Sequence, residues 1–365
     1  MKPVRRLISR LATAAVAAIA AGCAAYPPAV DPLSRTPTVL LPATRAGLVD
    51  QRAGFRQALC ALTTAPAGVA APVRDCDYPL VRVRGETDAL PVGDVRRNDL
   101  HDVRIVVVLG FAWDCVQGLF DGERLPARHL AGVGYDVTEI HVDGLAGSAY
   151  NAQLIQAALS RPEIATDRRP LVLIGYSKGA VDILEAVTRF PETAARVAAV
   201  ISIAGAIGGS PLADEFGTGS TALLRALPGA HCGIGDGEGL HSLSPTHRQA
   251  WLADHPLPHP PRYYSLVAFP GPDSVSPLLA SAHRRLSQVD ARNDGSLLPH
   301  DQLIPGAALL GYVDADHWSI ALPVDTSPLT DGVRNLLWEA AVRFVESDLA
   351  RERRDAQGGA SAYAQ

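Results

Sequence analysis

Residues 171–190 read LVLIGYSKGAVDILEAVTRF. Leu171–Ile174 is a short apolar run, which predicts a strand buried on both faces of a sheet. The segment 175–179 then places Ser177 between two glycines, and apolar residues recur at helical spacing from residue 180 to residue 187. A buried strand, a glycine-flanked serine and a helix in direct succession predict a sharp turn that exposes the Ser177 hydroxyl.

The predicted turn at Ser177 explains the residues around it. Side chains beside the serine would clash in so tight a bend, and glycines occupy positions 175 and 179. The helix that follows points its N-terminus, with unpaired N–H groups and the positive end of its dipole, at the same place. A serine hydroxyl is a weak nucleophile by itself, so the arrangement needs a base, and the base needs an orienting acid.

His317 is the histidine that best fits the role of the base. It follows a predicted strand at residues 309–313 and precedes a predicted C-terminal helix. His283 lies inside a predicted helix, His101 precedes a predicted core strand, and five more histidines crowd the stretch 205–261. Of the 11 histidines, only His317 combines a loop position after a strand with a place late in the chain.

Asp294 is favoured as the acid. It stands in Asn293-Asp294-Gly295, 23 residues before His317. Asp273 is the main alternative, because it follows the predicted strand that ends at residue 269 more directly. An Asp-Gly pair is also common in plain turns, and three further carboxylates near the histidine stay open as alternatives: Asp290, Asp314 and Asp316.

Strands and helices are expected to alternate from residue 103 onward. The predicted strands are Val103–Leu109, Val137–Val142, Leu171–Ile174, Ala198–Ile203, Tyr263–Phe269 and Leu309–Val313. Helices are predicted at about residues 51–62, 123–131, 149–160, 178–190, 277–289 and 329–349. The alternation predicts an α/β fold with a mostly parallel central sheet and helices on both faces.

Residues 205–261 break this alternation. The stretch is rich in glycine and proline and separates two predicted core strands. Segments this long between core strands are usually functional. We expect a cap or lid over the active face, with short helices near residues 219–227 and 245–253.

These segments together resemble a known family. The residues that carry the resemblance are Gly110-Phe111, the segment 175–179, Asn293-Asp294-Gly295 and Asp316-His317. Over roughly residues 103–349 the chain resembles bacterial lipases and esterases of the α/β-hydrolase superfamily, in which the chain order is serine, acid, histidine.

The resemblance implies a mechanism as well as a fold. A triad of Ser177, His317 and Asp294 would cleave carboxylic esters of small molecules or lipids through an acyl-enzyme, with no cofactor and no metal. The backbone N–H groups of Phe111 and Lys178 would form the oxyanion hole. Acyl transfer or phospholipase activity on the same fold is the alternative within enzymes. A non-catalytic binding lipoprotein is the alternative from another class.

Two positions depart from the family pattern. Ser319 stands two residues after the histidine, where lipases that bind calcium carry an acid. Lys178 follows the nucleophile, where lipases more often have a neutral residue. We expect its side chain to reach water or to pair with a carboxylate, and contact with an anionic substrate is the alternative.

The first residues are predicted to be an export signal. Residues 1–22 have a basic start and an apolar run at 11–21, which is too short to span a bilayer. The run ends in Ala20-Ala21-Gly22-Cys23, which resembles the lipobox of bacterial lipoproteins, with Cys23 as the lipidated residue. We therefore expect a lipid-anchored protein of the bacterial cell envelope. Plain secretion and a retained anchor are the alternatives.

The remaining boundaries follow from composition. Residues 23–100 are expected to be a tether and an N-terminal extension, residues 101–350 the hydrolase domain, and residues 351–365 a C-terminal tail. Hydrophobic residues make up 47% of the chain, which is enough for a packed core. The net charge of −5, without clustered basic residues, argues against a nucleic-acid partner.

Four cysteines remain once Cys23 is assigned to lipidation. They are Cys60, Cys76, Cys115 and Cys232. An even number in an exported chain favours disulfides, of which three pairings are possible. We prefer Cys60–Cys76 because the pair is local, which leaves Cys115–Cys232. Four buried thiols are the alternative, and the spacing does not fit a metal site.

Overall fold

The computed structural model describes residues 47–63, 76–83, 86, 95, 101–215, 230–233, 235–271, 274–324 and 329–362. The expected signal segment 1–22 and Cys23 lie outside the described residues. Asp273 and the helix expected near residues 219–227 lie outside them as well.

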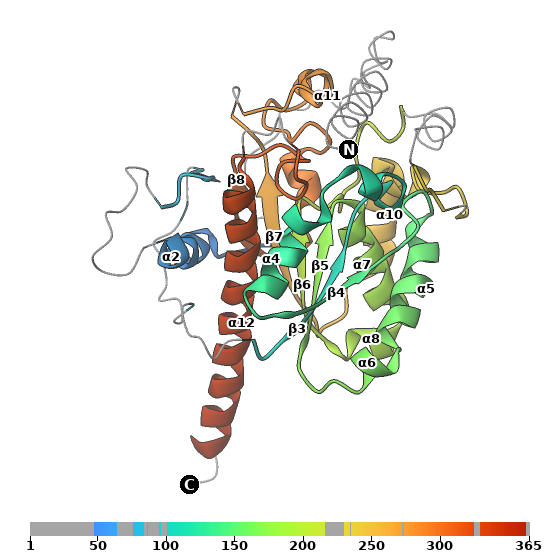
Figure 1. Ribbon diagram of the computed structural model, residues 1–365. Helices are drawn as coiled ribbons and strands as arrows, with labels where there is room; N and C mark the ends of the chain where they lie inside the picture. Colours follow the sequence, from blue (N-terminus) through green and yellow to red (C-terminus); the bar gives the residue numbers. More distant parts are fainter. Residues whose placement is uncertain are drawn as a thin grey trace, which may run out of the picture.

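One sheet forms the centre of the molecule (Figure 1). Its strand order is β1-β8-β7-β6-β5-β3-β4, and β2 also pairs with β8. Every pairing is parallel except that of β2 with β8. The strands are β1 (Val49–Asp50), β2 (Leu80–Val81), β3 (Arg104–Val108), β4 (Asp136–Ile140), β5 (Leu171–Tyr176), β6 (Val197–Ile203), β7 (Arg262–Ala268) and β8 (Ala308–Val313). The six strands expected from the sequence are all present, and the mostly parallel sheet is confirmed.

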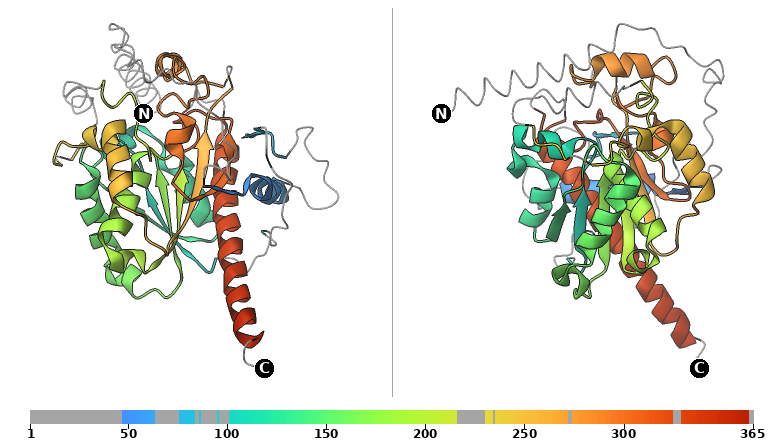
Figure 2. Two further views of the ribbon diagram at one scale, coloured as in Figure 1. Left: turned by 180° about the vertical axis from the view of Figure 1, so that it is seen from behind. Right: turned by 90° about the vertical axis from the view of Figure 1, so that its right-hand side faces the viewer.

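Helices cover both faces of this sheet (Figures 1 and 2). On one face lie α5 (Ser148–Leu159), α7 (Lys178–Arg189) and α10 (Pro245–Asp254). On the other lie α2 (Arg52–Thr63), α4 (Pro126–Gly132) and α12 (Asp331–Ala362). The shorter helices and turns are α3 (Trp113–Val116), η4 (Gln117–Leu119), η5 (Gly122–Arg124), α6 (Pro162–Ala165), α8 (Pro191–Ala194), η6 (His241–Leu243), α11 (Ala280–Leu286) and η7 (Pro299–Gln302).

The apolar run of β3 shows why such a strand needs cover on both faces. Ile105 and Val107 pack in the cluster under α2, α4 and α12, whereas Val106 and Val108 pack in the cluster under α5 and α7. Successive side chains of a strand point to opposite faces, so a continuous apolar run has to be buried on both sides. The carboxyl ends of the strands therefore form the accessible rim on which a site can be built.

Three predicted helix bounds differ from the structure. Helix α12 continues through most of the expected tail 351–365 to Ala362, because the residues after Leu349 carry no proline and are mostly good helix formers. Helix α4 begins at Pro126, after the separate turn η5, and not at residue 123. Helix α11 is limited to Ala280–Leu286, with a turn at residues 277–279 before it.

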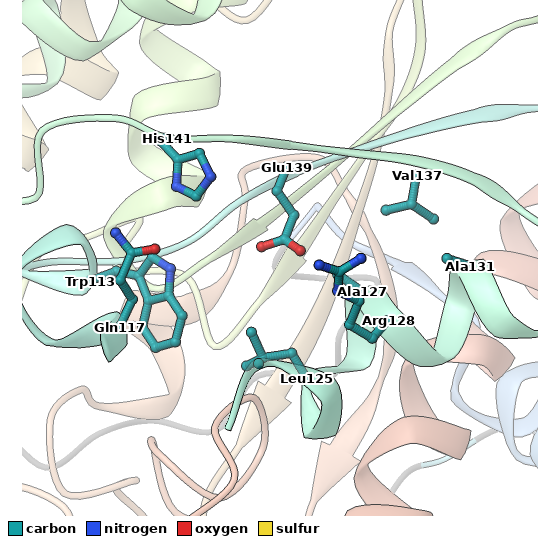
Figure 3. A pocket seen from close by; sticks show the side chains of 10 residues that line it. Trp113, Gln117, Leu125, Ala127, Arg128, Ala131, Val137, Glu139 and His141 are labelled. Carbon is teal, nitrogen blue, oxygen red and sulfur yellow. The ribbon is translucent and has the colours of Figure 1, made fainter. Parts of the chain in front are cut away.

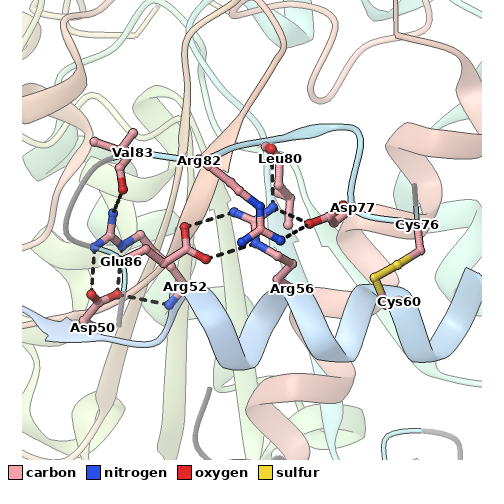
Figure 4. Close-up of polar contacts among 10 residues, drawn as sticks. All are labelled: Asp50, Arg52, Arg56, Cys60, Cys76, Asp77, Leu80, Arg82, Val83 and Glu86. Carbon is pink, nitrogen blue, oxygen red and sulfur yellow. Dashed lines mark hydrogen bonds and ion pairs between the residues drawn. A yellow bond between two sulfur atoms is a disulfide. The ribbon is translucent and has the colours of Figure 1, made fainter. Parts of the chain in front are cut away.

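The described part of the N-terminal extension packs against the sheet. Phe55 and Leu59 of α2 are fully buried in the core beside α12 and β8. Arg56 donates to the carboxylates of Glu86 and Asp77 (Figure 4). Described residues of the expected extension therefore share the core of the domain expected from residue 101 onward.

Both disulfides preferred from the sequence are present. Cys60 of α2 is joined to Cys76, and Cys115 of α3 is joined to Cys232 (Figure 4 shows the first). Disulfides form and persist in oxidising compartments, so they indicate an extracellular or periplasmic protein. Among the described residues, no helix is both long enough and apolar enough to cross a bilayer.

Candidate active site

Ser177 occupies the sharp turn between β5 and α7. Its backbone angles are φ 55° and ψ −126°, a conformation that a residue with a side chain rarely adopts. A Cβ on Gly175 would lie 2.3 Å from Ala180 Cα, and one on Gly179 would lie 2.1 Å from the Val108 carbonyl oxygen. Both glycines are therefore required by close backbone approach, and the turn holds the Ser177 side chain at the carboxyl end of β5.

His317 lies in the loop after β8 and contacts Ser177 directly. His317 Nε2 is 2.8 Å from Ser177 Oγ, and His317 Nδ1 is 2.6 Å from Asp294 Oδ2. An ionised carboxylate can only accept, so Nδ1 carries the proton and donates to Asp294. Nε2 is then free to accept the hydrogen of the Ser177 hydroxyl. The three side chains form one continuous hydrogen-bonded line, and all three residues are buried.

The backbone around Asp294 fixes its carboxylate. Asp294 Oδ1 accepts from the amides of Ser296 and Leu297, at 2.8 and 2.6 Å, which leaves Oδ2 for His317. The His317 amide also donates to the Asp294 carbonyl oxygen at 2.8 Å. Gly295 has φ 88°, the left-handed region that favours glycine.

Asn293 holds this turn from the other side. Its Oδ1 accepts from the Gly295 amide at 3.0 Å, and its Nδ2 donates to the carbonyl oxygen of Asp290 at 2.9 Å. The Asn-Asp-Gly sequence is therefore explained by geometry. The asparagine braces the turn, the aspartate reaches the histidine, and the glycine allows the bend.

The alternative acids are engaged elsewhere or lie outside the described residues. Asp290 pairs with Arg292 at 2.6 Å, and Asp314 accepts from the Gly271 amide at 2.7 Å. Asp316 accepts from the amides of Ser276 and Ser319. Asp273 is not among the described residues. Of the described carboxylates, Asp294 is therefore the one that reaches the imidazole.

Phe111 lies on the loop that faces Ser177 across the site. A Cβ on the preceding Gly110 would lie 2.7 Å from Ser177 Cβ, so only glycine lets this loop approach the serine. The next amide, that of Ala112, donates to the Gly144 carbonyl oxygen at 3.0 Å. The Phe111 amide has no acceptor within the described part of the chain. It can therefore donate to a bound group.

Lys178 begins α7 directly after Ser177. The first amides of a helix have no intrahelical acceptor, so the Lys178 N–H is available at the site. Its side chain turns away and is only 1% exposed, with Nζ 2.7 and 3.0 Å from the two carboxylate oxygens of Asp182. Pairing with a carboxylate is thus the outcome, and the lysine side chain does not face a substrate.

Sequence reasoning missed Tyr176 as part of the site. Its hydroxyl donates to the carbonyl oxygen of His317 at 2.7 Å, and the two rings lie 5.2 Å apart. Burial, with added effect from the Asp294 and Asp316 carboxylates, raises the pKa of Tyr176 well above its ordinary value. The phenol therefore stays protonated and can donate. Only its place beside the serine could have drawn attention to it.

The described residues around Ser177 and His317 are not arranged to hold a metal ion. Ser319, at the position where calcium-binding lipases carry an acid, is buried and its amide donates to Asp316 at 2.8 Å. Among the described residues, no group of three or more His, Cys, Asp or Glu side chains is arranged to hold a metal ion.

A surface pocket of about 380 Å³ lies apart from the triad, between α4 and the edge strand β4 (Figure 3). Trp113, Glu139 and His141 are among the residues that line it, and none of Ser177, Asp294 and His317 does. The pocket is therefore separate from the chemistry, although Trp113 is two residues beyond Phe111 in the chain.

Solved structures similar to this chain include a carboxyl esterase and a lipase. The metagenomic carboxyl esterase MGS0156 is 37% identical, with 87% of this chain and 98% of that chain covered and a TM-score of 0.71. The lipase of Staphylococcus hyicus (12% identity, 72% and 99% covered, TM-score 0.52) and EstA of Clostridium botulinum (12%, 71% and 91%, 0.51) share the fold. No protein-family model and no curated protein sequence matches the chain.

Proposed function

The chain belongs to the α/β-hydrolase family of carboxyl esterases and lipases, and from this premise we propose that Ser177, His317 and Asp294 are its catalytic triad. The observation that carries the proposal is the line of contacts from Ser177 Oγ through the imidazole to Asp294, at 2.8 and 2.6 Å. A nucleophile, a base and an orienting acid within hydrogen-bond reach are the signature of covalent serine catalysis.

The first half of the reaction forms an acyl-enzyme. Ser177 Oγ attacks the ester carbonyl carbon while His317 Nε2 takes its proton. Asp294 holds the tautomer of the imidazole and stabilises the imidazolium that forms. The Phe111 and Lys178 amides donate to the oxyanion. One such donor typically lowers the activation free energy by about 3 kcal/mol.

The first half ends when His317 gives its proton to the leaving alcohol, the C–O bond of the ester breaks and Ser177 is left acylated. In the second half, water attacks the acyl group while His317 Nε2 takes the water's proton. Ser177 then leaves with the proton returned to it, and the acid is released. The substrate class is carboxylic esters of small molecules or lipids, and the cycle requires no cofactor.

A fluorophosphonate probe tests the nucleophile, because such probes label only an activated serine. We expect covalent labelling of the folded wild-type protein and none of Ser177→Ala, which should unfold at a similar temperature. Ser160→Ala serves as the matched control, since Ser160 lies at the end of α5 and its hydroxyl donates only to the Gln156 carbonyl oxygen. Labelling or ester hydrolysis that persists in Ser177→Ala would overturn the proposal.

The acyl preference is measured with a panel of esters of graded chain length, presented as monomers and at a lipid interface. A rise in rate when the substrate forms an interface would identify a lipase, and its absence an esterase. Phospholipids and acceptor alcohols in the same panel distinguish phospholipase activity and acyl transfer. The function would be contradicted if the unlabelled wild-type protein hydrolysed none of these esters although the fluorophosphonate probe reacts with it.

We also propose export and lipid anchoring through Cys23. The support is the basic and apolar pattern of residues 1–22, together with two disulfides in the folded domain. The full chain expressed in a bacterium should partition into detergent, whereas Cys23→Ser should partition into the aqueous phase. Equal partitioning of the two proteins would contradict the anchor and leave plain secretion.

A further inference from the structure

Lys178 and Asp182 form an ion pair that is fully enclosed. Each side chain is 1% exposed, and both carboxylate oxygens of Asp182 contact Lys178 Nζ. Taking two charges out of water costs several kcal/mol per ion, so a buried pair is weak evidence for a gain in stability. The pair adds little stability and includes the residue directly after Ser177, so we consider a role other than stability.

The pair continues into a second buried residue on the neighbouring helix. Asn151 of α5 is 0% exposed, and its Nδ2 donates to Asp182 Oδ2 at 2.8 Å. The same amide group donates to the Asp143 carbonyl oxygen at 2.9 Å, and Asn151 Oδ1 accepts from the Asp143 amide at 3.1 Å. Asn151 therefore hydrogen-bonds to α7 through Asp182 and to the loop after β4 through Asp143.

That loop in turn holds the segment that carries the Phe111 amide. The Gly144 carbonyl oxygen accepts from the Ala112 amide at 3.0 Å, and the Gly144 amide donates to Asp114 Oδ1 at 3.0 Å. Ala112 has φ 57°, which costs a residue with a Cβ and has to be imposed by its contacts. A Cβ on Gly144 would lie 2.6 Å from the Ala112 nitrogen, so the two backbones meet closely.

We infer that Lys178, Asp182 and Asn151 form a positioning relay that sets the distance between the two backbone donors of the oxyanion hole. One end of the relay is the side chain of Lys178, whose own amide is the first donor. The other end is the 143–144 loop, which holds Ala112 and with it the adjacent Phe111 amide, the second donor. This inference rests on the proposed function.

In the relay, Asn151 and Asp182 affect catalysis without touching the substrate. A donor contributes fully only when it is held at the position that the oxyanion will occupy. Loosening the relay should therefore weaken binding of the transition state and leave binding of the ground-state ester nearly unchanged.

The test compares Asn151→Ala with a matched control, Tyr135→Phe. Tyr135 also loses a buried hydrogen bond, to Glu346 at 2.9 Å, but it lies under α12 on the opposite face of the sheet. We expect Asn151→Ala to lower kcat by about 10- to 100-fold, less than deletion of a whole donor, with KM within about twofold. Tyr135→Phe removes one buried hydrogen bond where Asn151→Ala removes three, so it should lose less stability, and it should keep kcat within about twofold of wild type.

A trifluoromethyl ketone provides the readout specific to the oxyanion hole, because Ser177 adds to it and leaves a negatively charged oxygen in place of the transition-state oxyanion. Its inhibition constant should rise in Asn151→Ala by the same factor by which kcat/KM falls. Asp182→Asn leaves the Lys178 ammonium buried without a counter-ion, so it should lower both the kcat and the free energy of unfolding.

The outcomes separate the relay from the triad. If Asn151→Ala does not fold, Asn151→Ser, which leaves the Lys178–Asp182 pair in place, carries the same measurements. Unchanged kcat in the folded variants, or a loss confined to KM, overturns the relay while Ser177-dependent hydrolysis by the wild type keeps the proposed function. Activity that survives Ser177→Ala overturns the proposed function instead.

Discussion

The Tyr176 hydroxyl donates a 2.7 Å hydrogen bond to the backbone carbonyl oxygen of His317. The residue immediately before the nucleophile therefore fixes the loop that carries the base. Strand β5 and the loop after β8 are not neighbours in the sheet, since β6 and β7 separate them. This hydrogen bond links the strand that leads to Ser177 with the loop that carries His317, independently of the Ser177–His317 contact.

Tyr176→Phe should lower kcat by about 5- to 10-fold, because a buried hydrogen bond of about 1 kcal/mol that orients the imidazole is lost. KM should change little, since the hydroxyl is turned away from substrate. Steady-state kinetics on one ester measures both. Tyr264→Phe is the control, because it removes another buried tyrosine hydrogen bond, to Asp348 at 2.7 Å, far from the triad. Equal kcat losses in the two variants would show a general effect of stability.

Asp294→Asn should lower kcat by about 10⁴-fold, because the amide cannot hold the imidazole in the tautomer that accepts the serine proton. Asp273→Asn should keep most of the activity. Rates of hydrolysis and of fluorophosphonate labelling both report the change. The reverse result, with Asp273→Asn inactive and Asp294→Asn active, would transfer the role of the acid to Asp273.

Cys60→Ala combined with Cys76→Ala should lower the free energy of unfolding by about 3 kcal/mol, as expected for a disulfide between residues 16 apart in sequence. The kcat should stay unchanged, because α2 packs beside α12 and β8 and not at the triad. Denaturant titration and a kinetic assay at 25 °C measure the two quantities. A large loss of kcat in the folded variant would link the N-terminal extension to the active site.

Asp301→Asn should stabilise the protein more at pH 7 than at pH 4. Burial raises the pKa of Asp301 to about 6, and the nearby Asp294 carboxylate adds to the rise against the opposing effect of His300. The folded pKa lies above the ordinary value of 3.8, so stability is full below about pH 4 and is lost as the pH rises through 6. The asparagine cannot ionise, and its advantage should reach at most about 3 kcal/mol at neutral pH.

Asp290→Asn provides the opposite sign in the same experiment. Burial raises the pKa of Asp290, but the stronger combined effect of the hydrogen bonds and charge of Arg292 lowers it below the ordinary value. Its stabilising contribution is present above about pH 4 and is lost on acidification, so this variant should lose stability at pH 7 and not at low pH. Denaturant titrations at several pH values would measure both, and parallel curves for the two variants would contradict the assignment.

The sequence was sufficient to predict the sheet and to select Ser177, Asp294 and His317, which the structure brings into contact, because both depend on local patterns. A continuous apolar run such as that of β3 is typical of a strand buried on both faces. Glycines on both sides of a serine after a buried strand indicate a sharp turn, because larger side chains would clash there. The two-residue strands β1 and β2 left no pattern to read. The end of α12 was placed too early because the apolar spacing stops at Leu349 while helical propensity continues.

The contacts that orient the triad could not be predicted from the sequence. Tyr176, Asn151 and Asp182 act through partners that are far away in the chain, and no spacing rule links Tyr176 to the carbonyl oxygen of His317. Lys178 could be expected to pair with a carboxylate. Which carboxylate, and what lies beyond it, depends on how α5 and α7 pack on the sheet.

The two shortest strands, β1 and β2, protect one edge of the sheet. β1 and β2 lie end to end along the outer side of β8, at residues 308–309 and 312–313. An uncovered strand rim offers its N–H and C=O groups to any other chain and is a starting point for aggregation. Proteolytic removal of everything before β3 would expose that edge of β8, together with the apolar core residues that α2 covers. The trimmed protein should therefore aggregate although it still contains Ser177, Asp294 and His317.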